Sequence, residues 1–267
     1  MKHWLLFFLG IVCCSLIVFS SSRAEEKPKD GFSLKTQLQD GWVVDYKPEP
    51  PSFITIQVDG KLHILFDGGA SLEGGVDHTG EPLLPIDVLT LGIPHDASLQ
   101  VELLEPVYEI IANQLVAPYP SYTYTNETEP VAEYKKNNVA YRQNKFFPAK
   151  QYIVDAPALF REQRIASVRI SPYQYNPATK VLRRLVRAIL LVKAKGATGT
   201  TIALPPSFAV DADPFFEETY ESALLNYDQA RGWRRSAESL FQSRVLQDST
   251  RDWFETGKNY YKMPIAE

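Results

Sequence analysis

The stretch from Arg164 to Lys195 carries the clearest alternation of apolar and polar residues in the chain. In its first part every second residue is apolar, which is the period of a half-buried β-strand. Pro172 ends this run, and Asn176-Pro177 favours a turn, because proline fixes φ and the asparagine side chain can hydrogen-bond to nearby backbone. From Val181 onward the chain carries apolar residues again, and from Ala188 to Val192 every position is apolar. The pattern predicts a hairpin of two strands at the centre of the fold, its second arm covered on both faces.

A helix is the competing interpretation of the second arm. Five apolar residues there also recur at helical spacing, with three arginines opposite, as in a basic amphipathic helix on a membrane surface. The apolar five are Leu182, Leu185, Val186, Ile189 and Leu190, and the arginines are Arg183, Arg184 and Arg187. The turn residues and the alternation of the first arm favour the hairpin.

Short strand candidates separated by proline and glycine fill much of the remaining chain. Asp59-Gly60, between two alternating runs, is a type I′ turn signal and marks the strongest local hairpin. Pro106 separates two candidates, and residues 118–144 are predicted to be irregular. The candidates are Gly41–Asp45, Phe53–Val58, Lys61–Phe66, Val88–Ile93, Leu99–Leu104, Val107–Val116 and Gln151–Val154. So many short strands predict an all-β fold, an antiparallel β-sandwich.

The N-terminal 24 residues have the composition of a secretory signal peptide. A charged front precedes an apolar run that is short for a membrane span, and small residues follow. We expect cleavage between Ala24 and Glu25, an extracytoplasmic mature protein and no stable membrane span once the signal is removed.

The rest of the chain divides by composition into four segments. Asp213 is the predicted N-cap of a short helix whose first residue is Pro214, and an arginine-rich stretch follows it. The predicted segments are a polar lead-in (25–40), the β-sandwich (41–210), the helix with an arginine-rich linker (211–252), and the start of a further region (253–267).

The composition removes several kinds of chemistry. Both cysteines, Cys13 and Cys14, lie in the signal peptide, so the mature chain has no disulfide and no thiolate nucleophile. The net charge of −4 over the full sequence argues against a nucleic-acid partner. The histidines at 63, 78 and 95 are too scattered for a zinc site, no G-x-S-x-G serine motif is present, and residues 67–78 lack the alternating acids of a calcium loop. We expect no cofactor, no metal and no catalytic site in this chain.

Four groups of residues resemble one known domain in the same order. They are Gly80-Glu81-Pro82-Leu83-Leu84-Pro85 with Gly92-Ile93-Pro94, then Phe147-Pro148, then Arg164 with Ile170-Ser171-Pro172, and then Gln174-Tyr175-Asn176-Pro177-Ala178-Thr179-Lys180. The chain from Gly41 to Lys195 is similar to the N-terminal propeptide domain of gingipain-type cysteine peptidases, which are caspase-like enzymes of clan CD. Sortase-like members that work with the type IX secretion system are included in this resemblance.

The resemblance implies a non-catalytic prodomain with a β-sandwich or jelly-roll fold. In the family such a domain keeps its peptidase latent, assists its folding and travels with it through the envelope. The implied partners are therefore its own or a cognate cysteine peptidase domain and the secretion machinery, with the chain a fragment of a longer zymogen. The alternative is a stand-alone structural or adhesion module exported to the cell surface.

Two candidate sites follow from a prodomain role. A latency domain must place a polar loop in the cleft of its peptidase, and Tyr134–Lys145 offers Lys135, Lys136 and Arg142 as plugs for an acidic pocket. Its removal requires a cleavable stretch after the last packed element, and residues 226–251 have that character. The candidate processing sites there are Arg231, Arg234, Arg235, Arg244 and Arg251.

Overall fold

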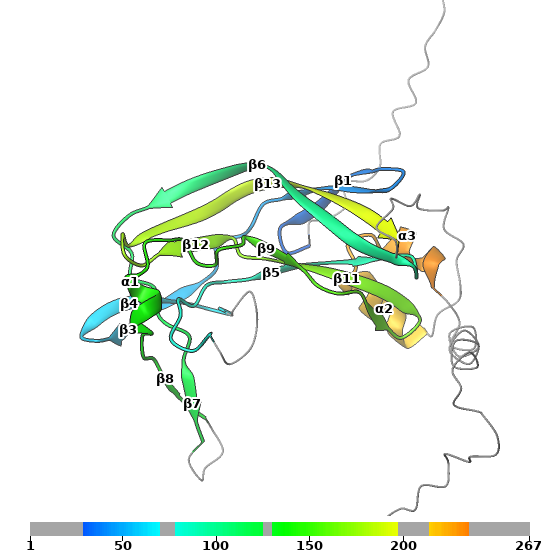
Figure 1. The fold of residues 1–267 in the computed structure, drawn as a ribbon. Coiled ribbons are helices and arrows are strands. Elements are labelled where there is room, and N and C mark those ends of the chain that lie inside the picture. The colour runs from blue at the N-terminus through cyan, green and yellow to red at the C-terminus, as the bar shows by residue number, and fades with distance from the viewer. Residues whose placement is uncertain (1–28, 70–77, 125–129, 197–213, 235–267) are drawn as a thin grey trace, which may run out of the picture.

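The computed structural model describes residues 29–69, 78–124, 130–196 and 214–234. They form two antiparallel β-sheets stacked face to face, with two small hairpins at one end and short helices at the other (Figure 1). The all-β fold class and the short C-terminal helix are thereby confirmed.

The first sheet is built around a single long strand, β13 (Val181–Gly196). One side of β13 pairs with β2 (Gly41–Tyr46) and β12 (Tyr173–Asn176), and its other side pairs along its length with β6 (Ala97–Ile111). The fifth strand, β1 (Phe32–Gln37), pairs with β2. The helical interpretation of this region is therefore wrong.

The second sheet is built around β11 (Gln163–Ile170). One side of β11 pairs with β5 (Asp87–Gly92), and the other with β9 (Tyr152–Val154) and β10 (Ala158–Phe160). The alternation that predicted this strand is confirmed, since Ala166, Val168 and Ile170 are all buried.

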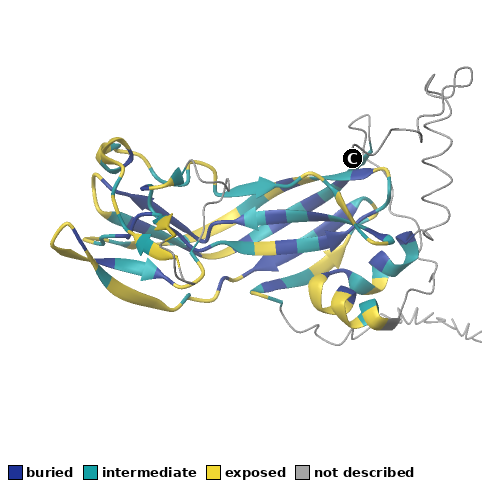
Figure 2. Ribbon diagram, turned by 90° about the horizontal axis from the view of Figure 1, so that it is seen from below, coloured by how far each residue is buried: buried dark blue, intermediate teal, exposed yellow. Residues whose placement is uncertain are grey.

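The main core lies between the two sheets (Figure 2). Each strand contributes every second side chain to it, because the side chains of a strand alternate between its faces. The largest fully buried side chains that these strands place in the main core are Trp42, Tyr46, Phe32, Leu89, Leu91, Ile170, Leu185 and Leu190. The outward-facing Ile189 and Leu191 of β13 are only half-buried, so the prediction that this arm is covered on both faces is wrong.

Three predicted features differ from the structure. The predicted hairpin joined the wrong strands: β12 turns back onto β13, whereas β11 belongs to the other sheet and the chain changes sheet at Ser171-Pro172. Pro106 does not end a strand, because Glu105 and Pro106 lie in a bulge of β6 where no partner on β13 needs the missing N–H. The predicted lead-in at 25–40 contains β1, whose Phe32 is buried and stacks on Tyr46 with ring centroids 4.4 Å apart.

Residues 118–144, predicted to be irregular, contain three regular elements. These are β7 (Ser121–Thr123), β8 (Val131–Glu133) and α1 (Asn138–Arg142). They lie at the same end of the molecule as the hairpin of β3 (Phe53–Val58) and β4 (Lys61–Phe66), whose bounds match the predicted strands residue for residue (Figure 1).

Short helices lie at the opposite end (Figure 1). They are α2 (Pro214–Ala223), α3 (Tyr227–Ala230) and the 3₁₀ turn η2 (Arg231–Trp233). Helix α2 begins at Pro214 as predicted, but residues 226–234 pack against the sheets instead of forming the predicted linker. Within the described residues, no helix is long and apolar enough to cross a membrane.

Candidate functional site

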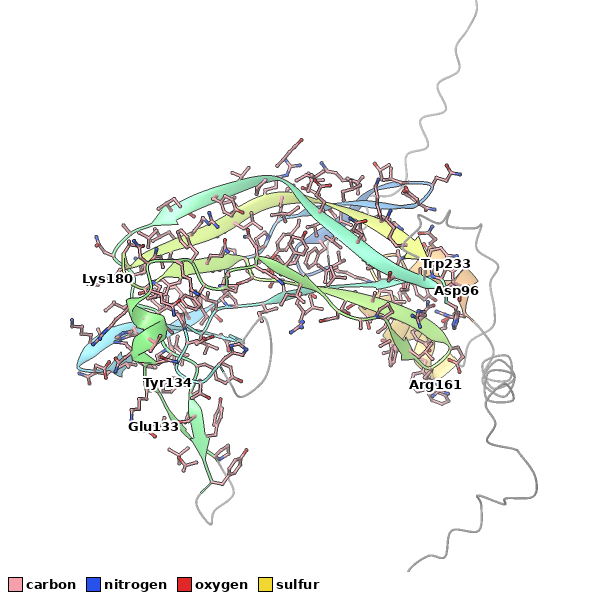
Figure 3. All side chains as sticks on the ribbon, viewed as in Figure 1. Asp96, Glu133, Tyr134, Arg161, Lys180 and Trp233 are labelled. Atoms are coloured by element: carbon pink, nitrogen blue, oxygen red, sulfur yellow. The ribbon has the colours of Figure 1, made fainter. Side chains whose placement is uncertain are left out.

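The end of the molecule that carries β3–β4, β7–β8 and the segment Tyr134–Lys145 is the candidate functional surface, called the distal surface below. Figure 3 shows Glu133 and Tyr134 at this end and Trp233 at the other. Apolar side chains more than half exposed gather on the distal surface: Phe53, Ile54, Leu62, Tyr122, Tyr124, Val131 and Val139. A large exposed apolar patch on a soluble domain marks a site of interaction.

Local hydrogen bonds fix the segment that carries the candidate plug residues. Asn137 caps α1, its Oδ1 accepting from Val139 N at 2.9 Å and from Ala140 N at 3.3 Å. The Asn137 N–H in turn donates to Gly80 O at 2.9 Å. A side chain at Gly80, whose φ is +83°, would come within 2.7 Å of Asn137 N, so this close approach requires glycine.

Tyr141 anchors the same segment to the second core cluster. Its hydroxyl donates to Val116 O at 2.9 Å, and burial raises the pKa of Tyr141 far above its ordinary value. That cluster, Phe66, Leu84, Val116, Tyr173, Tyr175 and Leu182, joins the distal end to β12 and β13. The segment is thus a braced element with a helical turn, instead of the free loop that the sequence predicted.

The structure separates the three candidate plug residues. Lys135 and Arg142 are exposed. Lys136 is held between two neighbours: its Nζ lies 3.1 Å from Asp59 Oδ2 in the β3–β4 turn and 5.6 Å from the centre of the Tyr141 ring. Lys135 and Arg142 are therefore available to a partner, whereas Lys136 ties the segment to the neighbouring hairpin.

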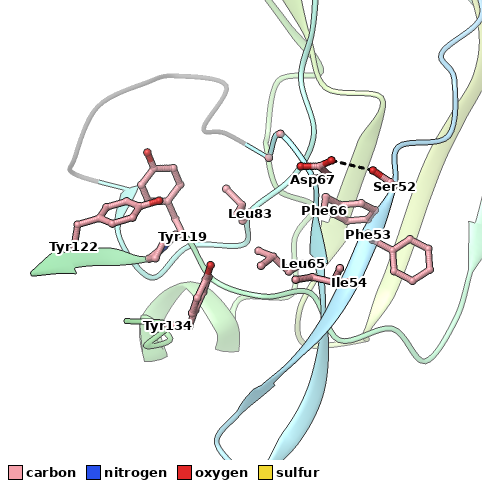
Figure 4. Close-up of a pocket in the computed structure, with 13 residues that line it drawn as sticks. Ser52, Phe53, Ile54, Leu65, Phe66, Asp67, Leu83, Tyr119, Tyr122 and Tyr134 are labelled. Atoms are coloured by element: carbon pink, nitrogen blue, oxygen red, sulfur yellow. Dashed lines mark hydrogen bonds between the residues drawn. The ribbon is translucent and has the colours of Figure 1, made fainter. Parts of the chain in front are cut away.

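A pocket of about 400 Å³ opens on the distal surface (Figure 4). Its walls are mainly apolar and aromatic, and Phe53, Phe66, Leu83, Tyr119, Tyr122 and Tyr134 contribute to them. Asp67 is its acidic group and accepts a hydrogen bond from Ser52 Oγ at 3.1 Å. Sequence reasoning missed this pocket and the exposed apolar side chains of β3 and β4. A signal was present at Phe53, an apolar residue on the same face as Thr55 and Gln57, which a hairpin packed on one face does not need.

The histidines make local contacts. His63 is 1% exposed, its Nδ1 lies 2.9 Å from Lys61 O, and burial lowers its pKa. His78 Nδ1 lies 2.8 Å from Glu81 Oε2. Within the described residues, no group of three or more His, Cys, Asp or Glu side chains could hold a metal ion.

The predicted processing sites fall into two groups. Arg231 is half-buried in η2, and Arg234 is only 4% exposed, so residues 231–234 are not the open linker that was predicted. The other three, Arg235, Arg244 and Arg251, lie outside the described residues, as do Ala24, Glu25 and most of the 67–78 loop.

Comparison with known proteins gives consistent matches. A family model described as Propeptide_C25 matches residues 24–227. Gingipain R1 of Porphyromonas gingivalis is 30% identical over 152 residues, which are 57% of this chain and 15% of that protein. Gingipain R2 of the same species is 27% identical over 157 residues, 58% of this chain and 21% of that protein. The chain thus spans a small part of the length of these relatives.

Two solved structures share the fold. One is described as the complex of Porphyromonas gingivalis RgpB pro- and mature domains, with a TM-score of 0.58 and 22% identity, covering 74% of this chain and 98% of that one. The other concerns the zymogenic latency of gingipain K from the same species, with a TM-score of 0.51 and 19% identity, covering 64% of this chain and 96% of that one. Because the family model covers residues 24–227, most of the sequence, the chain belongs to the Propeptide_C25 family and is a propeptide domain of the gingipain type.

Proposed function

We propose that this chain is a non-catalytic prodomain that binds a gingipain-type cysteine peptidase domain through the distal surface and keeps it inactive. The observation that carries this proposal is the distal surface itself, which combines exposed apolar side chains with two exposed cationic residues, Lys135 and Arg142, on a braced segment. The similar structures support the choice of partner, since one is of pro- and mature domains together and the other concerns zymogenic latency.

The contact residues that we propose are Lys135 and Arg142, presented by a segment that is rigid before binding. A preformed binding segment loses little conformational entropy on association, which favours tight inhibition. Lys136 has a supporting role through its ion pair with Asp59. In the same proposal the chain is exported, with its signal peptide cut between Ala24 and Glu25. It assists the folding of its peptidase, passes with it through type IX secretion, and leaves it after secretion.

An inhibition assay tests this function. The mature chain, residues 25–267, is titrated against the peptidase domain of the same source, with gingipain R1 as a second probe. We expect the double variant Lys135→Ala/Arg142→Ala to weaken inhibition about thirtyfold, the effect of losing about 2 kcal/mol at an interface hot spot. The matched control is Lys150→Ala, which removes an exposed lysine outside the segment. Unchanged inhibition by the double variant rules out this segment, and an absence of inhibition by the wild-type chain rules out the latency role.

Export has its own test. N-terminal sequencing of the secreted protein should start at Glu25, and a mature protein that retains Cys13 would contradict the signal-peptide assignment. We propose that processing by an arginine-directed peptidase occurs at Arg235, Arg244 or Arg251.

A further inference from the structure

The C-terminal helices complete the main core instead of following it. Tyr220, Leu224, Leu225, Ala230 and Trp233 are buried in the same cluster as the side chains of the two sheets. The Leu225 N–H donates to Thr90 O of β5 at 3.0 Å, and the indole of Trp42 on β2 donates to Gln229 Oε1 at 2.7 Å. Residues 214–234, the C-terminal brace, therefore hold both sheets.

The N-terminal end of the domain is tied to the same brace. The Lys29 ammonium donates to the carbonyl of Glu221 in the last turn of α2, and at 2.8 Å to the carbonyl of Leu224, the residue that follows the helix. A cation at this position is favourable because the C-terminal end of a helix carries partial negative charge.

The brace ends in a buried guanidinium. Arg234 is the last described residue, and its side chain is 1% exposed. Its Nη1 donates to both oxygens of Glu217 on α2, at 2.5 and 2.9 Å. Its Nε donates to Gln163 Oε1 of β11 at 3.3 Å. A buried charge is costly unless it is paired, and here one carboxylate supplies the pairing.

Two aromatic rings complete the surroundings of this guanidinium. Its central carbon lies 4.4 Å from the ring centre of Tyr220 and 5.7 Å from that of Tyr227. The Tyr227 hydroxyl also donates to Glu217 Oε2 at 3.4 Å. A planar cation beside aromatic rings, with Nη1 paired to a carboxylate and Nε to an amide oxygen, is an environment that suits arginine better than lysine, since lysine has one donor nitrogen instead of three.

We propose that Glu217, Tyr220, Tyr227 and Gln163 form a binding site for a guanidinium group, that the chain's own Arg234 occupies it, and that this occupancy conceals the peptide bond after Arg234 from proteases. A protease must draw its target arginine into its specificity pocket and extend the backbone around it. Both Trp233 and Arg234 are buried, so the brace has to open before this bond can be cut.

An order of cleavage follows from this arrangement. Arginine-directed proteolysis at Arg244 or Arg251 leaves the brace in place and the domain folded. A cut after Arg231 or Arg234 occurs only when the brace has opened. The cut after Arg231 also separates Trp233 and Arg234 from the sheets and leaves the Trp42 edge of the core uncovered, since the two indole rings lie 6.2 Å apart edge to face.

Limited trypsin digestion of residues 25–267, with products identified by mass and N-terminal sequencing, tests the concealment. We expect cuts after Lys150, which is exposed and lies outside the helices and strands, to precede any cut after Arg234. Glu217→Gln should speed the cut after Arg234 about ten- to a hundredfold, the effect of weakening a charge-assisted hydrogen bond. Glu218→Gln, an exposed neighbour on the same helix, is the matched control and should leave the rate unchanged. Wild-type cleavage after Arg234 as fast as after Lys150, or no effect of Glu217→Gln, overturns the proposal.

A second measurement tests the guanidinium site without protease and without a peptidase partner. Arg234→Ala should lower the thermal unfolding midpoint, and millimolar ethylguanidinium should restore part of the loss, because it can occupy the vacated site. Ethylammonium, with the same charge but no planar fork, should not. Equal effects of the two cations on the variant, or equal effects of ethylguanidinium on the variant and the wild type, overturn the site. If the distal surface proved not to inhibit a peptidase, the expected results of the trypsin digestion and of the thermal unfolding measurement would be unchanged.

Discussion

The side chain of Asn226 satisfies both backbone groups of Gly92, a residue 134 positions earlier in the chain. Its Oδ1 accepts from Gly92 N at 2.9 Å, and its Nδ2 donates to Gly92 O at 2.8 Å. Gly92 ends β5, so these bonds extend the second sheet into the C-terminal brace. Asn226 itself is 4% exposed, and no water can replace its amide without opening the brace.

Asn226→Ala should therefore lower the free energy of unfolding by about 2–4 kcal/mol, because two buried backbone groups lose their partners. Urea denaturation followed by tryptophan fluorescence measures it, since Trp42 and Trp233 lie beside the brace. The matched control is Asn138→Ala, an exposed asparagine in α1 that should change the unfolding free energy by less than about 0.5 kcal/mol. A loss of the same size in both variants would contradict the role assigned to Asn226.

Gly92 also leaves room for the brace, which a second substitution tests. A Cβ at position 92 would lie 2.3 Å from Cβ of Ala230. Gly92→Ala should lower the unfolding free energy by about 1–3 kcal/mol through overpacking. Ala230→Gly in the same chain removes the clashing atom. The double variant should therefore lose less unfolding free energy than the sum of the losses of the two single variants. Strict additivity of the two losses would show that the contact between α3 and β5 is not the cause.

Local sequence signals predicted the elements whose geometry is decided locally. Asp59-Gly60 fixes the turn and the register of β3–β4, and both strands match their predicted bounds. Pro214 begins α2 because proline has the right φ and lacks only an N–H that has no helical partner at that position.

Features that depend on contacts distant in sequence could not be predicted in the same way. The alternation in β11 shows a half-buried strand but not its partner, and the corner at Ser171-Pro172 sends this strand to the other sheet. Arg234 lies in a polar, arginine-rich stretch, so its burial depends on Glu217, Gln163 and two tyrosines that no local pattern connects to it. The brace was consequently interpreted as a linker.

The distal surface makes a prediction that separates binding from stability. Val139, on α1, is 70% exposed, so Val139→Asp should leave the thermal unfolding midpoint within about 2 °C of the wild type. It should weaken inhibition of the peptidase about tenfold or more, because a charge without a partner would be buried at the interface. Leu159→Asp, at a site 53% exposed on β10 in the second sheet, is the control and should inhibit like the wild type. Weaker inhibition by the control alone would place the interface elsewhere.

The buried Asp45 and the half-buried Asp87 make opposite contributions to the pH dependence of stability. Burial raises the pKa of Asp87 above its ordinary value of 3.8, although the Tyr46 hydroxyl donates to it at 2.5 Å. Burial acts in the same direction on Asp45, but there the Arg187 and Lys47 hydrogen bonds and the charge of Lys35 outweigh it and lower the pKa below 3.8. Arg187 Nε lies 2.8 Å from Asp45 Oδ1.

The sign of each contribution follows from proton linkage. Because the folded state raises the pKa of Asp87, its contribution is fully present below pH 3.8 and is lost as the pH rises through the raised value. Because the folded state lowers the pKa of Asp45, its contribution is present above pH 3.8 and is lost as the pH falls through the lowered value. Urea midpoints from about pH 3 to pH 7 should therefore show the wild type losing stability relative to Asp87→Asn as the pH rises, and relative to Asp45→Asn as it falls. Parallel midpoint curves for the wild type and Asp87→Asn above pH 3.8 would show that folding does not raise the pKa of Asp87.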